Sequence, residues 1–299
     1  WFPPVLSPAQ QAELKAAIQA APEAAGIDTA NWNWKGVRLF VQQRFSHRLS
    51  RSSCLNYLHR LGFVLKRPKK RLVKANAEKR DAFVADYAVL RTEAEASGAK
   101  IFFVDEAHFR ADVDLRAKWV LRGEPALADS TSPRLGEKAS YYSGVCLETG
   151  EVEYMAVTEN CRAETSVAFL QHLRKRHGQP LIVIWDNSPA HRGPEMREYL
   201  STPDLKLRLV ALPAYSPDFN ADEAIWDWAR EEVTANTCFG TAAKVQEKLE
   251  PFFAGLAEQP AEVQRRCRTT LQAQADALLA SPNLLFAQTH HVDFTLVSV

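Results

Sequence analysis

The sequence has few cysteines and no long apolar run. Its five cysteines are spread over 299 residues, and no two of them form a CxxC pair. This spacing argues against a disulfide framework and a structural zinc site, and it favours a reducing, cytosolic setting. Apolar stretches such as residues 101–104 and 181–185 fall far short of the roughly 20 residues needed to cross a bilayer, so we expect no membrane span.

The composition is that of an ordinary globular protein. Hydrophobic residues make up 46% of the chain and charged residues 24%, which excludes disordered, collagen-like and coiled-coil classes. At about 150 residues per domain, the length predicts about two domains.

The net charge of +1 hides a strong segregation of charge. Residues 1–100 carry 17 Lys and Arg against 8 Asp and Glu, whereas the remainder carries 20 basic and 28 acidic residues. Between Asn31 and Arg80, fourteen basic residues accompany a single acid, Glu78. Such a basic block predicts a polyanionic partner, most simply nucleic acid, and an acidic remainder can hold divalent cations; a solvated basic face is the simpler alternative.

Three short helical patterns occupy the first 62 residues. A Ser-Pro-x-Gln capping signal at Ser7 predicts a first helix to about residue 21, and apolar residues recur at helical spacing over 37–45 and 54–61. A tight connection before a polar third helix is typical of a helix-turn-helix fold, which reads DNA in the major groove. The third helix is assigned an apolar stripe of Cys54, Leu55, Leu58 and Leu61, opposite a DNA-binding face of Arg51, Ser52, Ser53, Asn56, His59 and Arg60.

A basic segment follows the third helix directly. Pro68 discourages helix there, so we expect an extended arm along phosphates or in a minor groove, although an ordinary linker would look the same. The basic residues assigned to this DNA-binding arm are Lys66, Arg67, Lys69, Lys70, Arg71 and, beyond them, Lys74.

The second half of the chain alternates strands and helices. After a helix over about 75–97, we predict a short buried strand over 101–104 that ends at Asp105, and further strands. This order indicates an α/β sheet with helices on both faces. The predicted strands are 118–121, a hairpin of 141–147 and 152–157, 181–185 and 207–211; the predicted helices are 163–176, 194–200, 221–233 and further helices within 242–279.

Three carboxylates stand where such a sheet places its ligands. Asp105 and Asp186 each follow an apolar strand, and Glu223 begins a helix after a proline-rich loop. If they converge, their mutual repulsion calls for cations, and oxygen ligands of this kind suit Mg²⁺ or Mn²⁺. The alternative is that both aspartates cap local segments and that Asn220 forms a capping box with Glu223.

Other polar residues near these acids receive lesser roles. We expect Glu106 and Asp222 to be surface charges rather than substitute ligands. His191 lies close enough to Asp186 in sequence to reach a DNA phosphate, and it is included among the DNA-binding residues.

Three sequence blocks resemble a known family. They are residues 103–106 (FVDE), 185–191 (WDNSPAH) and 212–223 (LPAYSPDFNADE), the last followed by Trp226. Together they are similar to the DDE transposases of the Tc/mariner superfamily, and most similar to the bacterial insertion-sequence (IS six-thirty) branch. The helix-turn-helix and basic arm are also similar to that family's DNA-binding region. The family normally has Asn-Pro-x-Glu where this chain has Asn220-Ala221-Asp222-Glu223.

The resemblance implies an RNase H-like catalytic core, a mixed sheet flanked by helices, in which Asp105, Asp186 and Glu223 match the catalytic and metal-binding triad. It implies two Mg²⁺ ions, for which Mn²⁺ can substitute. It also implies cleavage of double-stranded DNA at terminal inverted repeats and strand transfer into target DNA, usually at TA sites. The implied assembly is a homodimer in the bacterial cytoplasm, associated with the nucleoid.

These expectations assign three regions: a helix-turn-helix domain with a basic linker (1–75), a catalytic domain (76–240), and a helical extension with a tail (241–299). The leading hypothesis is a DDE transposase that combines metal-dependent endonuclease and strand transferase activity. The alternative is a catalytically inactive, domesticated DNA-binding or regulatory protein with the same fold. The two hypotheses differ in the triad, which is intact by residue type and therefore favours the enzyme.

Overall fold

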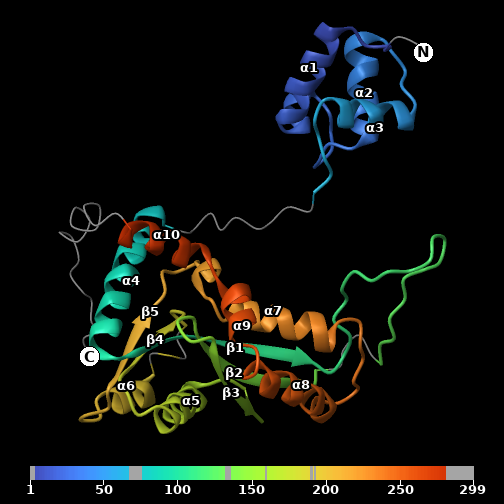
Figure 1. Ribbon diagram of the computed structural model, residues 1–299. Helices are drawn as coiled ribbons and strands as arrows, with labels where there is room; N and C mark the ends of the chain where they lie inside the picture. Colours follow the sequence, from blue (N-terminus) through green and yellow to red (C-terminus); the bar gives the residue numbers. More distant parts are fainter. Residues whose placement is uncertain are drawn as a thin grey trace. The chain divides into compact units, whose positions relative to one another are not determined.

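A computed structural model describes residues 4–66, 76–131, 136–158, 160–188, 191 and 193–280. The chain divides into two compact units, Trp1–Arg71 and Leu72–Val299, which are treated separately below (Figure 1).

The first unit is helical. It contains α1 (Pro8–Gln19), a 3-10 turn η1 (Pro22–Ala25), α2 (Trp34–Phe45) and α3 (Arg51–Arg60). Polar caps start each α-helix: Ser7 and Gln10 form the predicted capping box, the Asn33 side chain accepts from two backbone N–H groups, and Ser50 accepts from Ser53 N. The three predicted helices are therefore confirmed.

The apolar stripe of α3 differs by one residue from the prediction. Cys54 and Tyr57 are buried, whereas Leu55 is 36% exposed. The side chains that pack into the core are those at positions 54, 57, 58 and 61, which lie on one face of the helix. Tyr57 can enter the core because its hydroxyl accepts a 2.9 Å hydrogen bond from Leu6 N.

A five-stranded mixed sheet forms the centre of the second unit. Its order is β3-β2-β1-β4-β5; β1 pairs antiparallel with β2 and parallel with β4, β2 pairs antiparallel with β3, and β4 pairs parallel with β5. The α/β class predicted for this region is confirmed. The strands are β1 (Lys100–Arg110), β2 (Lys138–Cys146), β3 (Glu151–Val157), β4 (Leu181–Trp185) and β5 (Leu207–Ala211).

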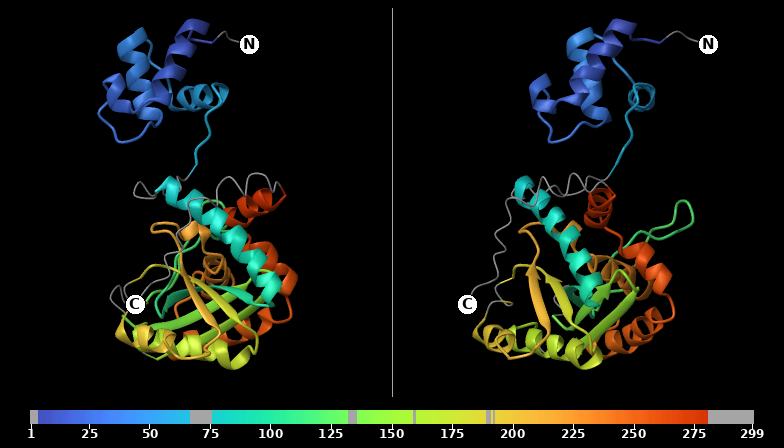
Figure 2. Two further views of the ribbon diagram at one scale, coloured as in Figure 1. Left: turned by 90° about the vertical axis from the view of Figure 1, so that its left-hand side faces the viewer. Right: turned by 60° about the vertical axis from the view of Figure 1, so that its left-hand side comes forward.

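Helices cover both faces of this sheet. Ile101 and Phe103 of β1 face α4 (Ala77–Ser97) and the C-terminal helices, and Phe102 and Val104 face the other side. That other side packs against α5 (Ala163–Arg176) and α6 (Pro194–Leu200). In Figure 1 the sheet lies between α4 and this pair, and Figure 2 shows α4 crossing one face.

The C-terminal helices complete the first of these faces. After the 3-10 turn η3 (Pro217–Phe219) come α7 (Glu223–Ala229), a π-helical turn η4 (Arg230–Thr234), α8 (Ala242–Leu256), α9 (Pro260–Cys267) and α10 (Thr270–Leu279). Trp226, Leu249, Phe253 and Leu271 are all buried in the same core as the sheet. Gly150 approaches the start of α9 so closely that a Cβ there would lie 2.3 Å from Pro260 O.

The predicted strand at 118–121 is wrong. Residues 115–131 form no helix or strand, and they project as an arm from the end of β1 (Figure 1). Trp119 is fully exposed, and Leu115, Leu121 and Leu127 are each more than 70% exposed. These apolar side chains suggested a buried strand, but they do not pack into a core.

β1 is longer than predicted. Its pairing with β4 ends at Phe103, but its pairing with β2 continues to Arg110. Asp105 therefore lies within the strand, at the point where the parallel neighbour stops. The alternation of Ala107 and Phe109, which are buried, with His108 and Arg110, which are exposed, marks the continuation.

Two further observations concern membrane spans and cysteines in the described residues. The helices that the structure describes include none with the length and apolar character required to span a membrane. All five cysteines lie in described segments, and all are free thiols.

Candidate active site

Three carboxylates from separate parts of the chain line one cavity. Asp105 lies on β1, Asp186 directly follows β4, and Glu223 is the first residue of α7. Adjacent parallel strands bring the first two together, because Phe103 is paired with Ile184 just before each strand reaches its acid. The cavity has a volume of about 580 Å³, and all three residues contribute to its wall.

A proline-rich loop also lines the cavity. Leu212 N donates a 2.8 Å hydrogen bond to Trp185 O, which fixes the start of this loop beside β4. The loop then passes Pro213 and Pro217 before the chain turns into α7. The loop thus determines where Glu223 enters the site.

Asn220 and Asp222 anchor the start of α7. The Asn220 side chain donates from Nδ2 to Val104 O (3.0 Å) and accepts from Asp222 N (3.2 Å). It does not cap the helix through Glu223, so the capping-box alternative is not what the structure shows. Asp222 is completely buried and accepts a hydrogen bond from Ser143 Oγ on β2. Glu223 itself is exposed to the cavity.

The acids influence each other electrostatically. Burial raises the pKa of Asp105 well above its ordinary range, and the charges of Glu223 and Glu106 raise it further. Burial also raises the pKa of Glu223, and Arg230 partly opposes this effect. Contact with His191 lowers the pKa of Asp186. The charged forms of Asp105 and Glu223 are therefore less favourable here than in water, and a bound cation would offset that cost.

The donor set fits a hard divalent cation, but it is not gathered into a finished coordination shell. Carboxylate oxygens are the ligands that Mg²⁺ and Mn²⁺ prefer, and crowded acids with raised pKa values are typical of such sites. Within the described part of the chain, no group of three or more His, Cys, Asp or Glu side chains is close enough to hold a metal ion as it stands.

Glu106 and Asp222 are not the surface charges that we predicted. Glu106 is partly buried beside Trp185, whose Nε1 donates to its Oε2 (3.3 Å). Burial raises the pKa values of both acids. The prediction failed because the sequence does not reveal the polar neighbours of these acids, Ser143 among them. A serine inside an apolar strand was nevertheless a signal that a polar side chain packs against it.

His191 is buried rather than turned toward solvent. It is 5% exposed, and its ring stacks on Trp185 with 3.9 Å between centroids. Its Nε2 lies 3.1 Å from Asp186 Oδ1 and 3.3 Å from Glu106 Oε1. This position does not suit the DNA contact that we predicted for it.

The residues predicted to bind DNA through α3 lie largely on its outer side. Arg51, Ser52, Asn56 and Arg60 are exposed, and Ser53 is partly buried with its N–H bound to the Ser50 cap. Lys66 is exposed at the end of the described part of this unit. The remaining basic residues of the predicted arm lie outside the described residues, namely Arg67, Lys69, Lys70, Arg71 and Lys74.

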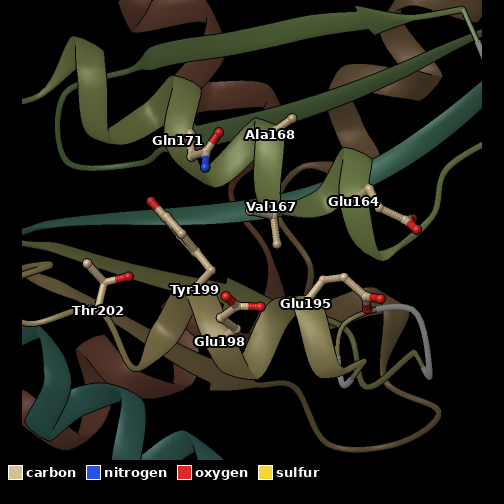
Figure 3. A pocket seen from close by; sticks show the side chains of 8 residues that line it. All are labelled: Glu164, Val167, Ala168, Gln171, Glu195, Glu198, Tyr199 and Thr202. Carbon is tan, nitrogen blue, oxygen red and sulfur yellow. The ribbon is translucent and has the colours of Figure 1, made fainter.

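A second cavity lies between α5 and α6 and contains none of the predicted site residues. It has a volume of about 460 Å³, and Glu164, Glu195 and Glu198 contribute to its wall (Figure 3). Its acids come from two neighbouring helices, with no strand-end carboxylate among them. These glutamates therefore serve as matched controls for the acids of the candidate active site.

Family comparisons match both units. A "DDE superfamily endonuclease" family matches residues 100–246, which include all three carboxylates. A "Winged helix-turn helix" family matches residues 28–87. These matches confirm a DNA-binding helix-turn-helix region followed by a DDE endonuclease domain.

One curated relative and two solved structures are similar to this chain. The chain is 22% identical over 252 residues to "Insertion element IS630 uncharacterized 39 kDa protein" of Shigella sonnei. The aligned residues cover 83% of this chain and 71% of that protein. Its fold resembles the mariner Mos1 paired end complex with Mg (TM-score 0.65, 20% identity, 94% of this chain and 80% of that chain). It also resembles the Mos1 strand transfer complex (TM-score 0.59, 19% identity, 92% and 80%).

The structural likeness confirms the predicted RNase H-like fold, and the family matches confirm the predicted enzyme class. Taken together, the family matches, the relative and the structural likeness support a DDE transposase of the Tc/mariner type, related to the IS six-thirty (IS630) branch.

Proposed function

We propose that this transposase cuts the ends of its element and joins them to target DNA with Asp105, Asp186 and Glu223 holding two Mg²⁺ ions. The observation that carries the proposal is the convergence of these three carboxylates on one cavity. Mn²⁺ would substitute for Mg²⁺, since both take oxygen ligands. The structural relative Mos1 is described as a paired end complex with Mg and also with Mn.

Each part of the site has a task in this reaction. A pair of bound ions would supply an activated attacking oxygen and a stabilised leaving oxygen at phosphorus. The chain itself supplies the ligands and holds them in place. β1 and β4 position the two aspartates, and Asn220 connects the start of α7, which carries Glu223, to β1. Because the described side chains do not by themselves form a coordination shell, cation binding would complete the arrangement.

The helical unit would recognise the terminal inverted repeats. Asn56 and Arg60 are exposed on α3, where an amide and a guanidinium can reach base edges and phosphates. Lys66, Arg67, Lys69, Lys70 and Arg71 would follow the DNA backbone. The concentration of basic residues between Asn31 and Arg80 supports this assignment.

A homodimer is the assembly that we propose, and the exposed arm supports it. Four large apolar side chains of the arm are each more than 70% exposed, and exposed apolar residues grouped in this way mark interaction surfaces: Leu115, Trp119, Leu121 and Leu127. A second copy of the chain would cover it. Replacing Trp119 with Ser should shift the molar mass measured by light scattering toward the monomer, and an unchanged dimer would contradict a role for the arm.

The family resemblance extends the proposal to target sites and location. We expect insertion at TA dinucleotides, in the bacterial cytoplasm where the nucleoid supplies the target. No residue of the described structure singles out this dinucleotide.

The decisive experiment uses DNA fragments that carry the ends of the flanking element. The protein is incubated with them in Mg²⁺, in Mn²⁺ or with a chelator, and the cut strands are mapped. Cleavage at the element ends that requires the cation supports the proposal. Binding without cleavage in any cation would instead indicate a domesticated DNA-binding protein.

A further inference from the structure

A buried imidazole sits behind the Asp186 carboxylate. His191 is 5% exposed, and its ring lies 3.9 Å from the Trp185 ring at an interplanar angle of 25°. Stacking on a fully buried tryptophan holds the plane of the imidazole. The ring therefore presents its two nitrogens in fixed directions.

One of these nitrogens faces two acids. His191 Nε2 is 3.1 Å from Asp186 Oδ1 and 3.3 Å from Glu106 Oε1. Although it is close to both oxygens, it makes no well-aligned hydrogen bond within the described structure. Glu106 is held from its other oxygen, which accepts from Trp185 Nε1. Asp186 Oδ1 also accepts from Ser188 N (3.0 Å).

The other nitrogen faces a chain of hydroxyl groups. His191 Nδ1 is 3.4 Å from Ser166 Oγ, which is 3.0 Å from the Tyr142 hydroxyl. A hydroxyl that donates to Nδ1 leaves the proton of a neutral imidazole on Nε2, toward the acids. Ser166 is completely buried, so water does not compete for this contact.

We propose that His191 is a positioning residue that orients Asp186 for a divalent cation, with Glu106 as a second acid beside the same imidazole nitrogen. This inference rests on the metal site of the proposed function. Groups that orient a ligand in this way commonly change metal affinity by about 10- to 100-fold when they are removed. A purely structural histidine would affect folding alone.

The test compares ring-preserving variants of the full chain. His191→Phe keeps the stack on Trp185 but removes both nitrogens, and His191→Gln restores an N–H donor near Nε2. The control is His172→Phe, because His172 also stacks on a phenylalanine and faces a different acid, Glu153. Mn²⁺ affinity is measured by calorimetry without DNA, and thermal unfolding is measured without metal.

We expect His191→Phe to weaken Mn²⁺ binding about tenfold or more, His191→Gln to recover part of the loss, and His172→Phe to bind as the wild type does. Unchanged Mn²⁺ affinity in His191→Phe, with or without a lower unfolding temperature, would overturn the inference. If His191→Phe does not fold, Ser166→Ala replaces it: weaker Mn²⁺ binding supports the inference, and wild-type binding overturns it. A wild-type chain that binds no Mn²⁺ would refute the metal site itself.

Discussion

Asn220 Nδ2 donates a 3.0 Å hydrogen bond to the main-chain oxygen of Val104, the residue before Asp105. One amide thereby connects the loop before α7 to the strand that carries the first acid of the triad. This link therefore helps to set the distance between Asp105 and Glu223. Asp222, bound to Ser143 on β2, adds a second link from the same turn.

Replacing Asn220 with Ala should damage both activity and stability. Val104 O and Asp222 N would lose their partner in a buried setting, which costs about 1–3 kcal/mol of unfolding free energy. We also expect a large loss of end cleavage, because α7 would no longer be tied to β1. Urea unfolding and a nicking assay measure the two effects.

Gln264→Ala is the matched control for that variant. Gln264 also donates to main-chain oxygens, those of Leu147 and Glu148, but it does not contact the site. It should lose stability and keep cleavage. Equal loss of cleavage in both variants would show that Asn220 acts only through stability.

The Arg80–Asp218 pair should make stability depend on acid pH. Arg80 donates to both carboxylate oxygens of Asp218 (2.9 and 2.6 Å), and this pairing lowers the pKa of Asp218. A lowered folded-state pKa adds stability above the unfolded pKa, near 4, and this stability disappears as pH falls through the folded value. Because Asp218 is half exposed, we expect Asp218→Asn to cost only about 0.5–1 kcal/mol at pH 7.

Denaturation at several pH values tests this expectation. The difference between wild type and Asp218→Asn should shrink as pH falls below about 4. Asp81→Asn, on the exposed side of α4, is the control that removes a surface carboxylate from the same region. A constant difference for Asp218→Asn would mean that the charge of this residue does not cause the effect.

Neutralising Lys69, Lys70 and Arg71 should weaken binding to all DNA sequences. Each lost phosphate contact should reduce the slope of log K against log salt by about 0.9. Binding measured by fluorescence anisotropy over a salt series provides the slope. If the slope stays the same, these residues do not contact phosphates.

Asn56→Ala should act on sequence preference rather than on general affinity. An exposed amide on α3 can pair with an adenine edge, and such a contact is worth about 1–3 kcal/mol against the wrong base. Selection of binding sites from randomised DNA should therefore change at one position. Equal losses on specific and random DNA would contradict base recognition.

Much of the fold could be predicted because local signals and tertiary packing agree. The strand at Leu181–Trp185 is buried on both faces and reads as a continuous apolar run, and α5 has the predicted periodicity. The arm around Trp119 violates that agreement, since its apolar residues face solvent. An apolar pattern alone does not say whether a core exists to receive it.

Asp105 and Asp186 could be proposed from their places after apolar runs, and Glu223 from its place after the proline-rich loop, but the surroundings of these acids could not. The hydrogen bonds of Asp222 to Ser143 and of Asn220 to Val104 join residues 79 and 116 positions apart. Spacing carries no information about such contacts. The burial of His191 likewise depends on stacking with Trp185, which sequence alone presents only as a neighbouring aromatic residue.

The central claim is that three distant carboxylates act as one metal site, and paired neutral variants test it most directly. Asp105→Asn, Asp186→Asn and Glu223→Gln are compared with Glu195→Gln, an acid of the other cavity, in Mg²⁺-dependent cleavage of element-end DNA. Each of the first three should lower the cleavage rate at least about 100-fold while DNA binding persists, and Glu195→Gln should cleave normally. Near-normal cleavage by Glu223→Gln would contradict the account.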